Sequence, residues 1–209
     1  MKQTRKRDDL IRVGRDIVVR QGFNATGLSD ILAKAGVPKG SFYYYFESKE
    51  DFGLAIIADF ADEYQKKLEG IFEDEQSSPL TRLRNYFEVG IQEMEASGCK
   101  SGCLMGNLAQ EMSAQSEVFR DRINQTFTHW ETYIASCLQA AQGSGELNNL
   151  SKAKTNDLAK FILSGWQGAM LRAKVIRSTA PLKTFIEILF EQVLEKDILL
   201  TCSDSSFAS

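Results

Sequence analysis

Residues 28–46 read LSDILAKAGVPKGSFYYYF, and this stretch decides the fold of the N-terminal part of the chain. Its apolar residues fall at helical spacing and predict a short helix that ends at Ala35-Gly36, followed by a second one from Gly40 to Phe46. Two short helices joined by a tight turn that contains glycine are typical of a helix-turn-helix. Because the second helix of that motif enters the major groove, the stretch predicts a DNA-binding head.

The second of these helices carries the side chains that we expect to meet DNA. The residues able to contact phosphates or base edges are Lys39, Gly40, Ser41, Tyr43, Tyr44 and Tyr45. Phe42 and Phe46 lie four residues apart, share one face and are predicted to be core. Successive side chains on a helix are about 100° apart around its axis. A helix this short therefore cannot bury three consecutive tyrosines. Tyr45 fits a packed position as well as an exposed one.

Three residues outside this helix complete the predicted DNA contacts, namely Thr26, Ser29 and Lys49. We expect Thr26 to cap a helix and to offer its hydroxyl to a phosphate. Lys49 follows the second helix closely, where it meets either a backbone phosphate or only solvent. Residues 1–50 hold ten Lys or Arg against six Asp or Glu, whereas the whole chain has a net charge of -3. A basic head on an acidic body favours a polyanionic partner for the head alone.

Apolar residues recur at helical spacing through the rest of the sequence, so the predicted fold class is all-α, with about nine helices. After the head, helices are expected over residues 48–73, 79–96, 102–112, 116–142 and 155–177, with a last one from Pro181 to about Lys196. We predict a DNA-binding domain over residues 1–48 and an effector-binding and dimerisation domain over residues 49–200. The polar tail over residues 201–209 is predicted to be disordered.

The composition argues against several other classes of protein. The longest uncharged apolar run, residues 161–171, is too short to span a membrane, and with no secretion signal visible we expect a cytoplasmic protein. The four cysteines are too few and too irregularly spaced for a disulfide framework. We expect no metal and no cofactor, because His129 is the only histidine and no phosphate-binding loop appears. Two alternatives stay open: a cysteine-dependent enzyme with His129 as its base, and a DNA-bending structural protein, against which the acidic body argues.

The head resembles a known family. Gly22-Phe23 and the gapless stretch over residues 28–50 are similar to the DNA-binding head of the tetracycline-repressor (TetR) family. The resemblance implies a transcriptional repressor with a three-helix head, a helical effector-binding body and a homodimer formed through the last two helices. Independently, the last helix carries more apolar surface than its own domain needs. The predicted dimer interface consists of Gly165, Gly168, Phe185, Ile186, Leu189, Phe190 and Val193.

The most informative segment of the body surrounds Cys103. This residue starts the predicted helix over residues 102–112 and shares a stripe with Asn107 and Glu111. A thiol at a helix N-terminus, here with Lys100 close in sequence, is where a thiolate is favoured and where electrophiles or oxidants react. The alternative is a small buried filler, which describes most cysteines outside disulfides.

The body also resembles the TetR branch that includes the N-ethylmaleimide-reductase repressor NemR and the acrylate-responsive repressor AcuR. The matching pieces are Gly102-Cys103-Leu104, residues 107–112, residues 145–147 and residues 165–174. That branch answers to reactive electrophiles or unsaturated acyl compounds, so the resemblance implies a sensor at Cys103. The predicted effector site consists of Cys103, Lys174, Trp166, Trp130, Asn107 and Tyr86. Cys99 could join Cys103 in a transient disulfide, and a purely reversible apolar ligand near Trp130, Trp166 and Tyr86 stays open as the alternative.

Overall fold

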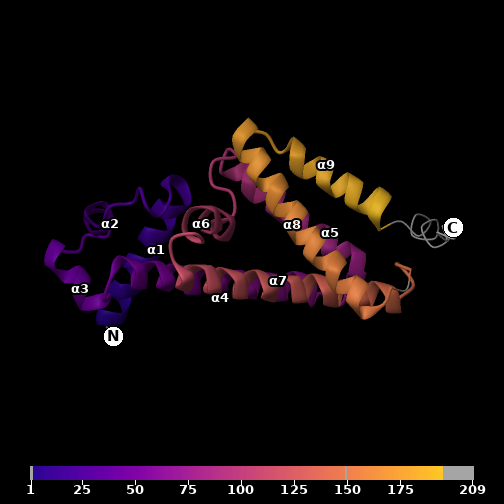
Figure 1. Cartoon of the computed structure of the whole chain (residues 1–209), viewed down its shortest axis with the longest axis horizontal. Coiled ribbons are helices and arrows are strands. Elements are labelled where there is room, and N and C mark those ends of the chain that lie inside the picture. Colours follow the sequence, from indigo (N-terminus) through magenta and orange to yellow (C-terminus); the bar gives the residue numbers. More distant parts are fainter. Residues whose placement is uncertain (1, 149, 195–209) are drawn as a thin grey trace, which may run out of the picture. The chain divides into compact units, whose positions relative to one another are not determined.

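The computed structural model of the chain describes residues 2–148 and 150–194. All regular secondary structure in this part of the chain is helical, as the sequence predicts (Figure 1). The helices are α1 (Lys2–Gln21), α2 (Leu28–Lys34), α3 (Phe42–Tyr45), α4 (Lys49–Phe72), α5 (Pro79–Ala96), α6 (Leu104–Met112), α7 (Glu117–Gly143), α8 (Lys152–Ile176) and α9 (Ala180–Ile188). A 3-10 turn at Lys39–Ser41 precedes α3, and a π-helical turn at Leu189–Val193 follows α9. The predicted tail over residues 201–209 and the helix end near Lys196 lie outside the described residues.

The helix ends follow local signals in the sequence. α1 is followed by Gly22, whose φ of +89° reverses the chain as a side-chain-bearing residue rarely can. α4 follows Ser48, whose Oγ accepts a hydrogen bond from the backbone N–H of Asp51 at 3.0 Å. α8 begins before the predicted Thr155, because Ser151 caps the helix with its side-chain oxygen.

By their contacts, the described residues divide into two compact units. The first contains the residues up to 67 together with 100–128, and the second contains 68–99 together with those from 129 onward. The first unit therefore holds α1 to α3 and also α6, a helix that the sequence prediction assigned to the body. The reason is direct packing, since α6 lies against α1 (Figure 1).

The first unit is built around an aromatic core that links the head to α4. Phe42 and Phe46 are buried, which confirms their prediction as core residues, and the ring of Phe46 lies 4.8 Å from that of Phe52. Phe52 in turn covers Gly14 of α1, where an added Cβ would overlap its ring. The reading segment, by which we mean residues 39–45, therefore rests on a rigid base.

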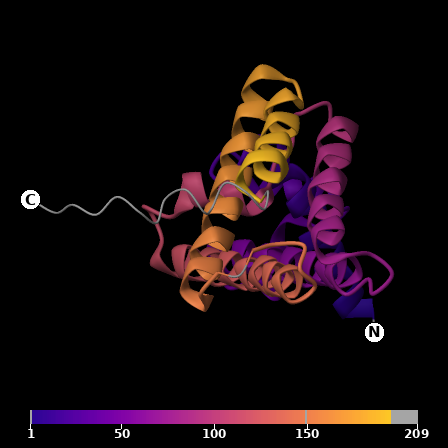
Figure 2. The same ribbon diagram turned by 90° about the vertical axis from the view of Figure 1, so that its right-hand side faces the viewer.

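The second unit packs α5, α8 and α9 together, and Figure 2 shows α9 alongside α8. Trp166 of α8 is one of its two buried tryptophans, and its ring centroid lies 4.8 Å from that of Phe87 on α5. Gly90 makes room for this indole, because an added Cβ would come within 2.7 Å of it. Among the described helices none is both long enough and apolar enough to cross a membrane.

Candidate DNA interface and effector site

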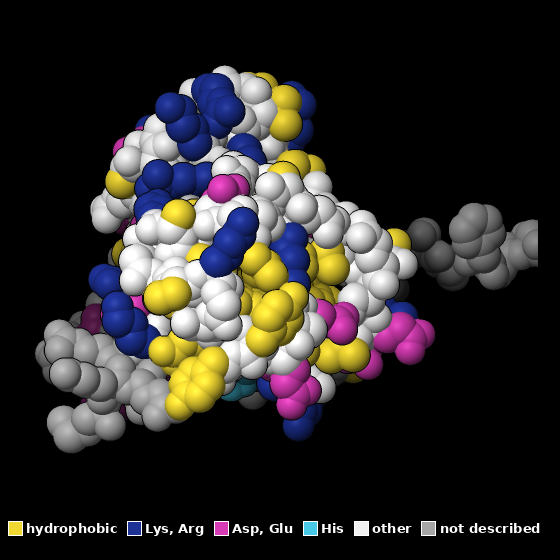
Figure 3. All heavy atoms as spheres, turned by 90° about the vertical axis from the view of Figure 1, so that its left-hand side faces the viewer, with side chains coloured by type: hydrophobic (Ala, Val, Ile, Leu, Met, Phe, Trp, Pro, Cys, Tyr) yellow, Lys and Arg dark blue, Asp and Glu magenta, His cyan; other side chains and the backbone are white. Residues whose placement is uncertain are grey.

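The reading segment presents two tyrosines to solvent. Tyr43 is 70% exposed and Tyr44 is 65% exposed, whereas Phe42 between Ser41 and these rings is almost fully buried. Figure 3 shows this face of the molecule, where Lys and Arg side chains lie beside exposed side chains of the hydrophobic class. Two large exposed rings over a packed base are costly to leave in water, and their hydroxyls are free to reach a polar partner.

Lys39, Gly40 and Ser41 form the turn that leads into α3. Lys39 and Gly40 are exposed and Ser41 is partly exposed. A Cβ added to Gly40 would meet no other atom of the chain within 4 Å, so internal packing does not explain the glycine. Close approach of an external partner to the backbone is a physical reason for glycine at this position.

The other predicted DNA contacts occupy different settings. Ser29 is exposed on α2 and Tyr45 is partly exposed on α3. Thr26 is buried, and its hydroxyl donates to the carbonyl oxygen of Gly22, so in this structure it closes the turn after α1. Lys49 is partly exposed, and its Nζ lies 4.8 Å over the ring of Phe23.

Cys103 lies at the N-cap of α6. Its backbone is extended, and its sulfur accepts a hydrogen bond from the N–H of Gly106 at 3.5 Å. The side chain is partly exposed, so small reagents have a route to the sulfur. Backbone N–H groups and the positive end of a helix dipole favour the thiolate over the thiol in such a position.

Two further cysteines have unreactive surroundings. Cys137 is buried on α7, donates to the carbonyl oxygen of Pro79 at 2.9 Å, and has its pKa raised to about 12, chiefly by burial. Its sulfur therefore stays a thiol near neutral pH, and a thiol is a poor nucleophile. Cys99 is 5% exposed with a φ of +55°, and its carbonyl oxygen accepts from Arg177.

The remaining residues of the predicted effector site are mostly buried. Trp130, Trp166 and Tyr86 are each 2% exposed and pack within the second unit. Lys174 is partly exposed on α8 of the same unit, whereas Asn107 belongs with Cys103 to the first unit. Neither tryptophan lines the pocket of the second unit whose wall includes His129 and Tyr133.

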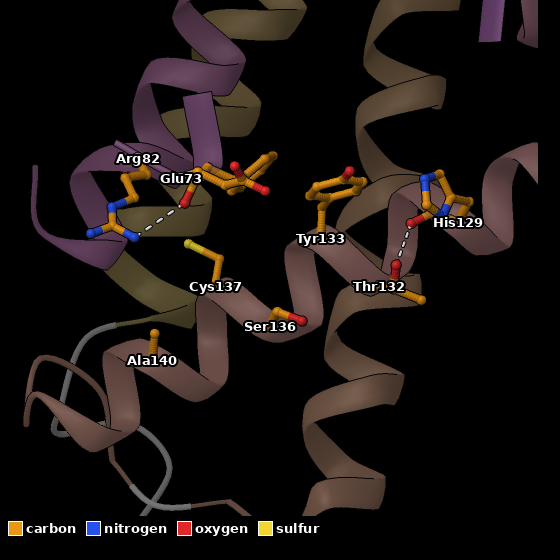
Figure 4. A pocket seen from close by; sticks show the side chains of 9 residues that line it. Glu73, Arg82, His129, Thr132, Tyr133, Ser136, Cys137 and Ala140 are labelled. Carbon is orange, nitrogen blue, oxygen red and sulfur yellow. Dashed lines mark hydrogen bonds between the residues drawn. The ribbon is translucent and has the colours of Figure 1, made fainter. Parts of the chain in front are cut away.

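The sequence prediction missed a pocket of about 350 Å³ on the second unit, lined by Phe72, Glu73, Arg82, His129, Thr132, Tyr133, Ser136, Cys137 and Ala140 (Figure 4). Several of its polar groups make hydrogen bonds within the chain. Arg82 donates to the carbonyl oxygens of Ser77 at 2.8 Å and of Phe72 at 3.1 Å, and thereby ties the start of α5 to the end of α4. Burial raises the pKa of Tyr133, and the nearby Glu69 and Glu73 raise it further, so this hydroxyl stays neutral.

The predicted dimer residues differ in exposure. Ile186 and Leu189 are buried within the second unit, Phe185, Phe190 and Val193 are partly exposed, and Gly168 is exposed. Gly165 is covered by its own chain, since an added Cβ would lie 2.6 Å from the ring of Phe185.

A different set of apolar side chains on α8 and α9 faces solvent, namely Phe161, Leu171, Val175, Ile176 and Ile188. Phe161, Gly168 and Val175 follow one another at intervals of seven residues, which places them on one face of α8. The spacing of seven residues could be seen in the sequence. Which face of α8 is exposed to solvent could not be predicted from it.

Comparisons with known proteins agree with this architecture. Residues 10–56 match the family model described as bacterial regulatory proteins, tetR family, and residues 79–189 match the one described as tetracyclin repressor-like, C-terminal domain. The HTH-type transcriptional repressor DhaR of Mycobacterium sp. (strain GP1) is 34% identical over 194 residues, which cover 93% of this chain and 95% of DhaR. The transcriptional regulator AcuR of Cereibacter sphaeroides is 38% identical over 176 residues, 84% of this chain and 80% of AcuR.

A solved structure extends the similarity to three dimensions. The crystal structure of E. coli NemR in its reduced form aligns with a TM-score of 0.79 and 30% identity, and covers 89% of this chain and 96% of that one. The matches span both the head and the body, and the relatives named here are transcriptional repressors or regulators. The chain is therefore a member of the TetR family, a DNA-binding transcriptional repressor and not an enzyme.

Proposed function

We propose that this repressor binds a palindromic operator as a homodimer and releases it when a small electrophile, an oxidant or an unsaturated acyl compound reacts or binds at Cys103. In this proposal the residues at the DNA are Lys39, Gly40, Ser41, Tyr43 and Tyr44, with support from Ser29 and Tyr45. TetR-family regulators bind DNA and small ligands and act as dimers. The operator, the effector and the release step are specific to this proposal.

The proposed DNA contact is supported by the different exposure of neighbouring aromatic residues in and beside the reading segment. Phe42 and Phe46 are buried in the aromatic core, so they fix the segment, while Tyr43 and Tyr44 stand in solvent. Phenolic hydroxyls can donate to phosphate oxygens or base edges, and Lys39 adds a positive charge beside them. Gly40 lets the backbone come close to the groove without any cost to internal packing.

A homodimer fits the exposed apolar face of α8. Phe161, Leu171 and Val175 are exposed to solvent in the isolated chain, at 59%, 43% and 64%. Packing this face against the same face of a second copy removes the side chains from water and creates two-fold symmetry. A two-fold dimer presents two heads, which favours an operator with two symmetric half-sites.

The release step rests on Cys103. Its sulfur is partly exposed at the N-cap of α6, whereas Cys99 and Cys137 are buried. Addition of an electrophile to this sulfur, or its oxidation, removes the hydrogen bond from Gly106 and adds bulk at the start of the helix. The solved structure of the relative NemR is described as its reduced form. This supports a redox-linked state for this branch.

The test is operator release by N-ethylmaleimide, measured by fluorescence anisotropy, in the Cys202→Ser chain and in the Cys103→Ser, Cys202→Ser double variant. The shared Cys202→Ser substitution removes the cysteine that lies outside the described residues. We expect the maleimide to release the chain that retains Cys103 and to leave the variant bound. Equal release of both would remove Cys103 from the mechanism, and intact mass spectrometry in parallel counts the adducts.

A reversible apolar ligand is the second candidate. It predicts operator release with no change in protein mass, and release that reverses on dialysis. The pocket beside His129 and Tyr133 offers room for such a ligand without opening the core around Trp166.

A further inference from the structure

The turn between α1 and α2 determines where α2 and the reading segment begin. It starts at Gly22, with its φ of +89°, and continues through Phe23 and Asn24. Phe23 is buried, its ring centroid lies 5.1 Å from that of Phe119 on α7, and an added Cβ on Gly53 of α4 would come within 2.6 Å of it. The turn is thus locked by its side chain against two long helices.

A carboxylate from α6 holds the backbone of the same turn. One oxygen of Glu111 accepts from the N–H of Phe23 at 2.7 Å, and the other accepts from the N–H of Asn24. A Cβ on Gly22 would lie 3.0 Å from this carboxylate, so the glycine allows the close approach. Two consecutive backbone donors on one ionised acceptor form a strong, directional contact between segments about ninety residues apart.

Lys49 also contacts the turn. Its Nζ donates to the carbonyl oxygen of Asn24 at 3.4 Å and lies over the ring of Phe23. Burial lowers the pKa of Lys49, and the negative charge of the nearby Glu111 carboxylate opposes that shift. Lys49 is the first residue of α4 and follows the reading segment closely.

Asn107, one helical turn before Glu111, makes a second connection from α6. Its amide nitrogen donates to the carbonyl oxygen of Val19, near the end of α1, at 3.4 Å. The same nitrogen donates to the carbonyl oxygen of Ser101 at 2.9 Å, two residues before the N-cap Cys103. One face of α6 therefore carries the candidate sensor at its start and two contacts to the head farther along.

We propose that Glu111 is a positioning residue for operator binding, whose two hydrogen bonds to Phe23 and Asn24 couple the placement of α6 to that of the DNA-reading helices. Asn107 assists it through the end of α1. The coupling to effector release rests on the proposed function, whereas the positioning of the turn does not. Displacement of α6 breaks or shifts both contacts. The N–H groups of Phe23 and Asn24 then lose their hydrogen bonds to the Glu111 carboxylate.

The variant Glu111→Gln isolates this contact with little change of shape. The amide oxygen can still accept one N–H, but the amide NH2 then faces the other backbone donor, and a donor facing a donor cannot bond. Hydrogen bonds to a charged acceptor contribute enough that losing one weakens operator binding by about tenfold. General electrostatics predicts the opposite sign, because removing a negative charge favours a polyanion.

The experiment compares operator affinity of the full-length wild type, Glu111→Gln and the control Glu117→Gln, together with amide hydrogen exchange over residues 22–26. Glu117 is exposed at the start of α7 in the same unit, so its replacement removes the same charge without touching the turn. We expect about tenfold weaker binding and faster exchange only for Glu111→Gln, at unchanged helical content. Operator affinity and exchange equal to the control would overturn the proposal.

Two further arms keep the result decisive. If Glu111→Gln fails to fold, Asn107→Ala removes the other contact of α6 without a charge change, and we expect about threefold weaker operator binding at native helical content; unchanged affinity would contradict the proposal. If N-ethylmaleimide releases the wild type, the ratio of affinities with and without reagent should shrink in Glu111→Gln, which a purely structural role does not predict. If N-ethylmaleimide does not release the wild type, only the proposed thiol sensor is refuted. The role of Glu111 is still tested by operator affinity and by hydrogen exchange over residues 22–26.

Discussion

The ring of Phe52 occupies the space in which a Cβ on Gly14 would stand. Through this contact the long helix α4 lies directly against the backbone of α1. Because Phe52 also packs on Phe42 and Phe46, the same ring supports the reading segment from below. The stability of the head and the orientation of its DNA-binding residues are therefore linked at one aromatic side chain.

Gly14→Ala should destabilise the first unit by about 1–3 kcal/mol, because the added methyl overlaps a ring that neighbouring rings hold in place. Thermal and urea unfolding followed by circular dichroism measure the change. Gly40→Ala is the matched control, since its methyl meets no atom of the chain. It should leave stability unchanged or slightly higher and weaken only operator binding. Equal stability losses for the two variants would contradict the packing described for the head.

Val175→Asp should convert the dimer to a monomer. Val175 is 64% exposed on the proposed α8 interface, and a carboxylate in an apolar contact between subunits is strongly unfavourable. Loss of the second head should weaken operator binding by about a hundredfold, as expected when two linked contacts become one. Sedimentation velocity and operator titration provide the measurements. Val118→Asp, at a valine that is 54% exposed on α7, should remain dimeric.

Glu146→Gln should lower stability at neutral pH and have little effect in acid. Burial tends to raise the pKa of Glu146, but hydrogen bonds from Ser78 at 2.7 Å, Ser144 at 2.8 Å and the N–H of Leu80 outweigh it, so the net pKa is lowered. A carboxyl with a depressed folded-state pKa stabilises the fold above its unfolded value of about 4.3, and the contribution is lost as pH falls through the folded value. Melting temperatures of both proteins should differ at pH 7, and the difference should shrink as pH falls below about 4.3. A constant difference across that range would show that the charge plays no part.

Cys137 should resist alkylation in the folded chain. Its pKa of about 12 leaves almost no thiolate at pH 7.5, whereas Cys103 accepts a backbone N–H that favours the thiolate. Peptide mapping after brief exposure to N-ethylmaleimide should find the adduct on Cys103 and not on Cys137. In denaturant both should react, which controls for the chemistry of the reagent. Rapid labelling of folded Cys137 would contradict the burial described here.

The elements that depend on local signals could be predicted from the sequence. The helix-turn-helix, the buried pair Phe42 and Phe46, and the cap at Ser48 all follow from periodicity and capping residues a few positions apart. Cys103 at the start of α6 was likewise predictable, because Gly102 and the apolar stripe mark the helix start.

Contacts between distant segments could not be predicted. Glu111 was placed on the stripe of Cys103, but nothing in its neighbourhood shows that its carboxylate holds the turn at Phe23, since that contact depends on how α6 packs on α1. Thr26 was expected to offer its hydroxyl to DNA, yet the chain reversal at Gly22 brings a carbonyl oxygen to it first. Which apolar residues of α8 face outward also depends on packing, which buries Trp166 and leaves Phe161 in solvent.

Recognition of a two-fold operator by the reading segment is tested by a footprinting titration on DNA that the wild-type chain selects from a random-sequence pool. We expect a discrete palindromic footprint, with half-sites about one helical turn apart or a multiple of it. The doubly substituted Tyr43→Phe, Tyr44→Phe chain should be equally stable but should need at least about tenfold more protein for the same protection. Diffuse protection without symmetry, or an identical titration for the substituted chain, would contradict this recognition.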